Sequence, residues 1–230
     1  MSKIIITGGE GMLGSYFTEG LKLSHQDLDV TNSAQVEEVI RREQPKAIVH
    51  LAAVTDMKRC EEDPDFAQAV NATGTKNLAS AARGVGAKLV YVSTNAVFDG
   101  QKSEAYLPTD LSQPVNVYGQ TKHLGELATL DADPKNLVIR TSWIFGGGEQ
   151  KDKKFVGKLM PKFQAGEAIK GVDDVLGTPT YAKDLAVAIQ KSIEDDLSGT
   201  IHITNAGQAS RYDMAVVMKE ALGCASEVMG

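Results

Sequence analysis

Short apolar runs alternate with longer stretches of helical periodicity along most of the chain. Four runs have no polar alternation and predict strands buried on both faces: 3–7, 47–51, 88–93 and 137–141. Four stretches repeat their apolar residues with helical spacing: 12–21, 33–42, 63–83 and 116–130. Buried strands separated by helices predict an α/β fold with a doubly wound parallel sheet, covered by helices on both faces.

Capping residues support two of these helices. Ser33 is the expected N-cap of the helix over 33–42. Asp63 and Pro64 supply an acidic cap and a proline at the first helical position, which start the helix that ends near Arg83. Ligands of parallel sheets bind at the carboxyl ends of the strands. We therefore expect the chemistry in the loops that follow the four predicted strands.

The pattern changes after Gly146, where a polar stretch rich in glycine and lysine begins. Beyond it, the spacing predicts helices over 155–164, 182–194 and 210–222 and a strand over 200–204. We expect a dinucleotide-binding core over residues 1–150. Residues 151–230 are expected to form a small substrate lobe, interleaved with the last core strand and helices.

Composition narrows the function classes. The chain has 230 residues, 42% of them hydrophobic and 23% charged, which suits one globular unit. Its formal net charge of −6 disfavours binding to nucleic acid. The apolar run at residues 4–6 is too short for a signal peptide or a membrane span, so we expect a cytoplasmic protein with no membrane partner. Cys60, Cys224 and the histidines show no metal-binding spacing, and no metal site is expected.

A glycine-rich turn follows the first strand directly. Gly8, Gly11 and Gly14 are spaced so that the backbone can approach a pyrophosphate, and a helix from Met12 would direct its N–H groups at the anion. The strand before the turn and the predicted helix after it favour a Rossmann-type nucleotide site over a turn that binds nothing.

The residues after this unit do not decide between NAD and NADP. A carboxylate at the end of the second strand would favour NAD, but Ser24 and His25 occupy that position. Asp29 and Val30 either flank an adenine edge or form a plain turn, and both interpretations stay open.

Tyr118 and Lys122 are four residues apart on a predicted helix and therefore share one face. A cation beside a phenol lowers its pKa, which would suit the tyrosine to proton transfer at a carbonyl or carbinol oxygen. Such pairs also occur by chance on ordinary helices. Thr94, at the end of the strand over 88–93, favours a catalytic role for the pair because a hydroxyl there can position a substrate carbonyl.

Taken together, these features resemble the extended short-chain dehydrogenase/reductase family, and most closely its dTDP-4-dehydrorhamnose reductases. The matching segments are 7–14, 28–31, 51–55, 70–75, 91–94, 97–100, 118–122, 140–143 and 177–181. The resemblance implies that Thr94, Tyr118 and Lys122 are catalytic. It also implies a set of cofactor-binding residues, which are Gly8, Gly11, Met12, Leu13, Gly14, Asp29, Val30, Leu51, Ala52, Ala53, Tyr118 and Lys122.

The resemblance further implies that Thr94, Asn95 and Trp143 contact a nucleotide-sugar substrate, and that NADPH or NADH reduces the 4-keto group of a dTDP-linked 6-deoxyhexulose, for dTDP-L-rhamnose synthesis. A homodimer is plausible by analogy with the superfamily. Asn95 and Ala96 replace the Asp-Tyr that the family usually has, so the choice of sugar stays open. The alternatives are another nucleotide-sugar oxidoreductase or epimerase, and a cofactor-binding regulatory subunit like the β subunit of methionine adenosyltransferase.

Overall fold

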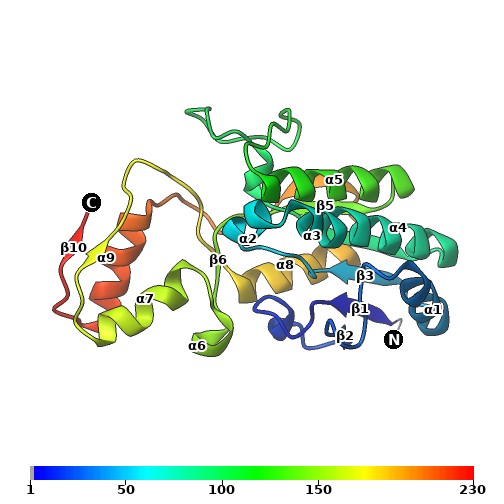
Figure 1. The fold of residues 1–230 in the computed structure, drawn as a ribbon, viewed down its shortest axis with the longest axis horizontal. Coiled ribbons are helices and arrows are strands. Elements are labelled where there is room, and N and C mark those ends of the chain that lie inside the picture. The colour runs from blue at the N-terminus through cyan, green and yellow to red at the C-terminus, as the bar shows by residue number, and fades with distance from the viewer. Residues whose placement is uncertain (1–2) are drawn as a thin grey trace.

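A computed structural model describes residues 3–230 and contains a six-stranded parallel sheet (Figure 1). The strand order is β2-β1-β3-β4-β5-β9, and every neighbouring pair runs parallel. The strands are β1 (Ile4–Thr7), β2 (Leu21–Leu23), β3 (Ala47–His50), β4 (Lys88–Val92), β5 (Leu137–Arg140) and β9 (Gly199–His202). The doubly wound α/β architecture expected from the apolar runs is therefore confirmed.

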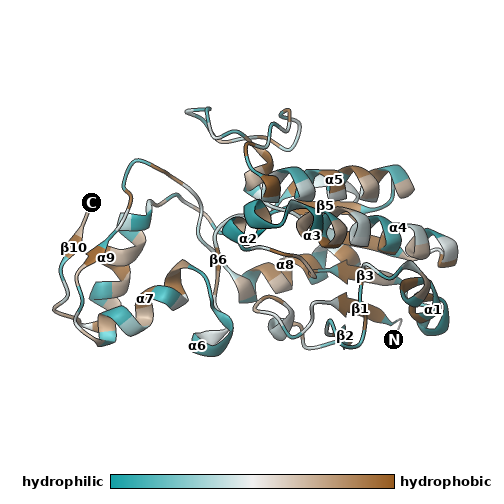
Figure 2. Ribbon diagram, viewed as in Figure 1, coloured by the Kyte–Doolittle hydropathy of each residue, from teal (hydrophilic) through white to brown (hydrophobic). Residues whose placement is uncertain are grey.

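Helices cover both faces of the sheet, but unequally. One face carries α1 (Ser33–Glu43), α4 (Gly74–Val85) and α5 (Val117–Ala132). The opposite face carries α8 (Ala182–Glu194) and a single 3₁₀ turn, η1 (Gly14–Tyr16). In Figure 2 strands β1 and β3 are strongly apolar, because both their faces are buried under these layers.

The chain changes direction between β1 and β3. From β1 it moves outward to β2, and it then returns to the other side of β1 to form β3. Such a reversal leaves a crevice at the carboxyl ends of the two central strands, where ligands of open α/β sheets bind. The glycine loop follows β1, and residues 51–55 follow β3, so both predicted cofactor segments lie at this crevice.

A smaller lobe lies beside the carboxyl edge of the sheet (Figure 1, left). Its elements are α7 (Phe155–Gln164), α9 (Arg211–Leu222), β7 (Ile169–Lys170) and β10 (Val228–Met229). Leu159, Phe163, Ile169 and Ala215 form its own small core. Three connections join lobe and sheet. The first contains β6 (Ile144–Phe145) and α6 (Gly148–Lys151), the second contains β8 (Thr180–Tyr181), which pairs with β6, and the third is the loop over 203–210 between β9 and α9.

The helix expected over residues 12–21 is wrong. Only η1 forms there, Phe17 is already extended, and β2 begins at Leu21 opposite Ile5. Thirteen residues, 8–20, connect β1 to β2, close to the shortest chain that can cross between parallel strands. Since the glycine loop takes the first half of this connection, no length remains for a helix.

The other elements follow the sequence more closely. The helices over 155–164 and 182–194 are confirmed, and the one expected over 63–83 is a continuous rod: α3 (Pro64–Gln68), a π-helical turn η2 (Ala69–Thr73) and α4. The N-cap of α1 is Asn32, which accepts a hydrogen bond from the Gln35 N–H, and not Ser33. The pattern missed α2 (Met57–Glu62), a six-residue helix capped by Asp56.

A buried ion pair joins α5 to the sheet. The Arg140 guanidinium, at the end of β5, donates to both carboxylate oxygens of Glu126 at 2.9 Å and 2.7 Å. Both side chains are almost fully buried. Burial alone would raise the pKa of Glu126, but the hydrogen bonds and positive charge of Arg140, together with smaller contributions from neighbouring side chains, lower the pKa overall.

We predict that Arg140→Met destabilises the fold by about 3–5 kcal/mol, because it leaves the Glu126 carboxylate buried without its cation. The double variant Arg140→Met/Glu126→Leu is expected to recover most of this loss, since no unpaired charge remains. Urea unfolding of the three proteins measures both effects. A single variant as stable as the wild type would show that the pair does not hold α5.

Candidate active site

The loops after β1 and β3 touch at the crevice. Gly8 has a φ of +66°, and a Cβ on it would lie 2.8 Å from the Ala52 backbone nitrogen. A side chain here would strain the backbone and collide with the neighbouring loop. The Ala52 N–H in turn donates to the Thr7 hydroxyl at 3.4 Å. Gly8, Leu51 and Ala52, predicted to bind the cofactor, therefore line one continuous backbone surface.

The glycine loop fits a pyrophosphate without a helix behind it. Gly14 packs against Gly9 so closely that a Cβ would lie 2.6 Å from its backbone, which folds the loop into a tight cradle. Within residues 3–230, the backbone N–H groups of Met12 and Leu13 have no protein acceptor. Free N–H groups in a glycine cradle are suited to phosphate oxygens. The residues present thus fit a dinucleotide, although the expected α-helical dipole is absent from this segment.

Asp29 and Val30 play different parts. The Asp29 carboxylate accepts hydrogen bonds from the Thr31 N–H and hydroxyl, which lower its pKa. The side chain of Val30 is buried in the core, where it contacts Gly74 of α4. Only the backbone of Val30 and the edge of Asp29 are therefore available to an adenine.

The N-terminus of α5 lies directly on the turn that follows β4. Thr94 lies two residues beyond the end of β4 and caps the 3₁₀ turn η3 (Asn95–Val97) by accepting from the Ala96 N–H at 3.1 Å. A Cβ on Gly119 would lie only 2.1 Å from the Ala96 carbonyl oxygen. Glycine at this position therefore permits a contact that places Tyr118 beside Thr94, two residues that sequence analysis proposed as partners.

The pKa of Tyr118 moves opposite to the sequence expectation. Burial raises it to about 12, and an interaction with the Thr94 side chain opposes this rise only in part. Lys122 does not lower it, because the Lys122 ammonium is directed elsewhere. With this pKa, Tyr118 is a protonated phenol throughout the neutral range, which is the form that can donate a proton.

Lys122 is buried under the end of β4. Its Nζ donates to the Val92 carbonyl at 2.7 Å and lies 4.0 Å from the centroid of the Tyr91 ring. Burial lowers its pKa to about 7, and the nearby Glu126 carboxylate opposes this shift. An amine that titrates near neutrality can carry or release its charge as ligands enter the site.

The two remaining predicted substrate residues differ in exposure. Asn95 is exposed, and its backbone N–H donates to the Thr141 carbonyl at 2.9 Å. Trp143 comes two residues after Thr141 in the chain and has a left-handed φ of +42°. Its indole ring is covered by the Arg211 guanidinium, 3.7 Å from the ring centroid, and by Gly177, where a Cβ would lie 2.5 Å from a ring carbon. A sugar that approaches Trp143 therefore meets an indole already in contact with Arg211 and Gly177.

Sequence analysis missed two residues that shape the site. Asn71, buried in the π-helical turn, accepts from the Val54 N–H at 2.8 Å and donates to the Val54 carbonyl at 3.0 Å. It thereby fixes the loop after β3. The segment 70–75 was part of the resemblance, but no periodicity indicates which of its residues holds this loop. Arg211 was missed because it reads as an ordinary first residue of a helix.

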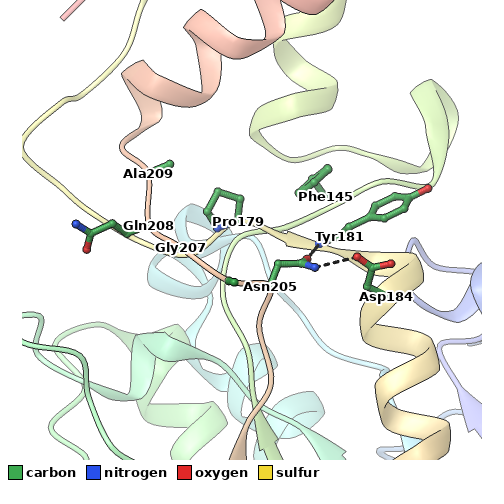
Figure 3. Close-up of a pocket in the computed structure, with 9 residues that line it drawn as sticks. Phe145, Pro179, Tyr181, Asp184, Asn205, Gly207, Gln208 and Ala209 are labelled. Atoms are coloured by element: carbon green, nitrogen blue, oxygen red, sulfur yellow. Dashed lines mark hydrogen bonds between the residues drawn. The ribbon is translucent and has the colours of Figure 1, made fainter.

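A separate pocket of about 490 Å³ lies between β6, β8 and the loop after β9 (Figure 3). Asn205 accepts from the Tyr181 N–H at 2.7 Å and donates to Asp184 at 2.8 Å, so these polar groups satisfy one another.

Among residues 3–230, no group of three or more potential metal-ligating side chains converges. The same part of the chain has no helix long and apolar enough to cross a membrane.

Comparison with known proteins gives consistent results. The family of the RmlD substrate binding domain matches residues 2–229. A dTDP-4-dehydrorhamnose reductase from Mycobacterium tuberculosis is 39% identical over 96% of this chain and 76% of the relative. A dTDP-4-keto-6-deoxy-D-glucose reductase from Streptomyces niveus is 35% identical over 95% of this chain and 78% of its own length. The structure of a dTDP-4-dehydrorhamnose reductase from Bacillus anthracis in complex with NADP superimposes with a TM-score of 0.95 at 34% identity, over 100% of this chain and 84% of that one.

We predict that Gly119→Ala destabilises the protein by about 1–3 kcal/mol, because its new methyl group cannot fit against the Ala96 carbonyl. Gly84→Ala on α4 is the matched control. Nothing lies within 4 Å of a Cβ at Gly84, so alanine is expected to stabilise that helix by up to about 1 kcal/mol. Denaturant unfolding of both variants measures the difference, and equal effects would contradict the proposed close contact.

Proposed function

The chain belongs to the family of the RmlD substrate binding domain, and we propose that it reduces the 4-keto group of a dTDP-linked 6-deoxyhexulose with NADPH or NADH. The protein is an NAD(P)-dependent oxidoreductase of the dTDP-4-dehydrorhamnose reductase type. The observation that carries the assignment to this site is the contact between the Tyr118 end of α5 and the Thr94 turn, at the edge of the sheet where the glycine cradle opens.

The proposed roles follow from what each group can do. Gly8, Gly11, Gly14 and the free N–H groups of Met12 and Leu13 hold the pyrophosphate, and residues 51–53 border the dinucleotide. When bound, the reduced nicotinamide supplies a hydride to the carbonyl carbon. The Thr94 hydroxyl donates a hydrogen bond to the carbonyl oxygen and orients it.

Tyr118 completes the reduction by giving its phenolic proton to the oxygen, so that C=O becomes CH–OH. Its raised pKa keeps that proton in place at neutral pH until negative charge develops on the substrate oxygen. Lys122 is directed at the Val92 carbonyl in the structure; we propose that with the cofactor bound it turns to hold the nicotinamide ribose and there stabilises the resulting phenolate. Solvent then returns a proton to Tyr118.

Asn95 and Trp143 are proposed to contact the sugar. We also propose that residues 1–150 form the dinucleotide-binding core and that 151–230 supply the substrate lobe along with β9 and α8. We propose a cytoplasmic location, in keeping with two cysteines that form no disulfide. A homodimer is proposed by analogy with the superfamily alone.

We predict that Tyr118→Phe lowers kcat for reduction of a dTDP-4-keto-6-deoxy sugar about a hundredfold or more, because the proton donor is lost. Binding of NADPH is expected to change little, since the ring remains in place. Loss of the absorbance of the reduced cofactor measures turnover, with a panel of dTDP-4-keto sugars as substrates. Titration of cofactor fluorescence measures binding.

Two results would count against this proposal. A wild-type protein that binds the cofactor but reduces no nucleotide sugar would rule out the reductase activity and favour a regulatory role. Full activity in Tyr118→Phe would leave the reaction class intact but remove Tyr118 as the acid.

A further inference from the structure

Arg211 is a cation without an anion. Its guanidinium lies 3.7 Å from the centroid of the Trp143 ring and 4.8 Å from that of Phe155. Within the described part of the chain, its one hydrogen bond goes to the Met214 sulfur, a weak acceptor, at 3.6 Å. Among residues 3–230 no carboxylate forms an ion pair with it. A guanidinium has five N–H donors, so most of its hydrogen-bonding capacity is unused.

Partial burial of an unpaired guanidinium costs folding free energy, which a bound anionic ligand would offset. The side chain is about half-buried, and burial lowers its pKa with no neighbouring carboxylate to oppose the shift. Contact with two aromatic rings restricts the guanidinium and so reduces the entropy lost when it binds a ligand. A fixed, partly desolvated guanidinium is the preferred protein partner of phosphate, to which it can donate two parallel hydrogen bonds.

The position of Arg211 connects it to the proposed active site. Trp143, beneath the guanidinium, comes two residues after Thr141, whose carbonyl accepts from the N–H of Asn95, the neighbour of Thr94. Arg211 itself is the first residue of α9 in the smaller lobe. The guanidinium therefore lies at the junction of the sheet edge and the lobe, on the chain segment that leads directly away from the catalytic turn.

A second cation spans the same junction. Lys154 immediately precedes Phe155, and its Nζ donates to the Thr55 carbonyl at 3.1 Å and to the Thr55 hydroxyl at 2.6 Å. Thr55 belongs to the loop after β3, so this lysine reaches from the lobe to the strand ends. Burial lowers the pKa of Lys154, and the Asp56 carboxylate opposes that shift. Lys154 and Arg211 thus bring two positive charges to the junction between lobe and sheet, which favours a ligand with two negative charges, such as a diphosphate.

We propose that Arg211 binds the diphosphate of the nucleotide-sugar substrate and that its stacking on Trp143 couples this binding to the position of the sugar. This inference rests on the proposed function and adds to it a specificity-determining residue. The Trp143 indole then acts chiefly as the platform that orients Arg211. Nucleotides with a diphosphate are selected over nucleosides because only they provide oxygens for the guanidinium fork.

The single tryptophan offers a direct assay, because Trp143 is the only one in the chain and lies beneath Arg211. We would titrate the protein with dTDP and with thymidine and follow tryptophan emission, with calorimetry as a second measure of affinity. In Arg211→Gln the Kd for dTDP is expected to rise about tenfold to a hundredfold. The Kd for thymidine should stay within about twofold. Arg211→Lys keeps the charge but loses the guanidinium fork, so its Kd for dTDP should lie between those of the wild type and Arg211→Gln.

Lys162→Gln is the matched control. Lys162 is an exposed residue of α7 in the same lobe, so this variant removes one positive charge without touching the junction. Its dTDP affinity should equal that of the wild type. In turnover assays, Arg211→Gln should raise KM for the sugar nucleotide while kcat and the affinity for NADPH change little.

The outcomes separate this inference from the reductase assignment. Unchanged dTDP affinity in Arg211→Gln, equal losses for dTDP and thymidine, or no dTDP binding by the wild type would overturn the role of Arg211. A wild type that binds dTDP through Arg211 but reduces no keto sugar would instead refute the reductase activity and keep the diphosphate site. Melting temperatures of all variants show whether a loss of binding reflects unfolding.

Discussion

The docking of α5 on the ends of β4 and β5 is the constraint on which the site depends. Three contacts produce it: the approach of Gly119 to the Ala96 carbonyl, the hydrogen bond from Lys122 to Val92, and the buried pair of Glu126 with Arg140. Because they lie on successive turns of one helix, they fix both its distance from the sheet and its rotation. Tyr118 reaches Thr94 only when both are set.

The same helix supplies the electrostatics of the site. Burial raises the pKa of Tyr118 and lowers that of Lys122. At neutral pH Tyr118 therefore keeps its proton, whereas Lys122 is close to its titration point. A reductase needs this assignment, because the tyrosine must donate a proton and the lysine must respond to charge created beside it. The lobe adds two cations at its junction with the sheet: Arg211, over the Trp143 ring, and Lys154, which donates to Thr55 in the loop after β3.

The fold could be predicted, and the candidate site residues proposed, because both rest on local patterns. Apolar runs without alternation identified the parallel strands, and the spacing of Tyr118 and Lys122 placed both on one helical face. The absence of a helix after the glycine loop could not be predicted, because hydrophobic periodicity does not show how many residues the chain needs to cross from β1 to β2. The direction of the Tyr118 pKa shift and the stacking of Arg211 on Trp143 depend on tertiary burial, which spacing along the chain does not contain.

The central claim is that the residues around Thr94 and Tyr118 direct a hydride to a sugar carbonyl carbon. NADPH labelled with deuterium at the transferring C4 position tests it most directly, with a dTDP-4-keto-6-deoxy sugar as acceptor and mass spectrometry of the product. The account predicts one deuterium in the product, on the carbon that was the carbonyl. A reduced sugar without deuterium at that carbon, or oxidation of the cofactor without any reduced sugar, would contradict it.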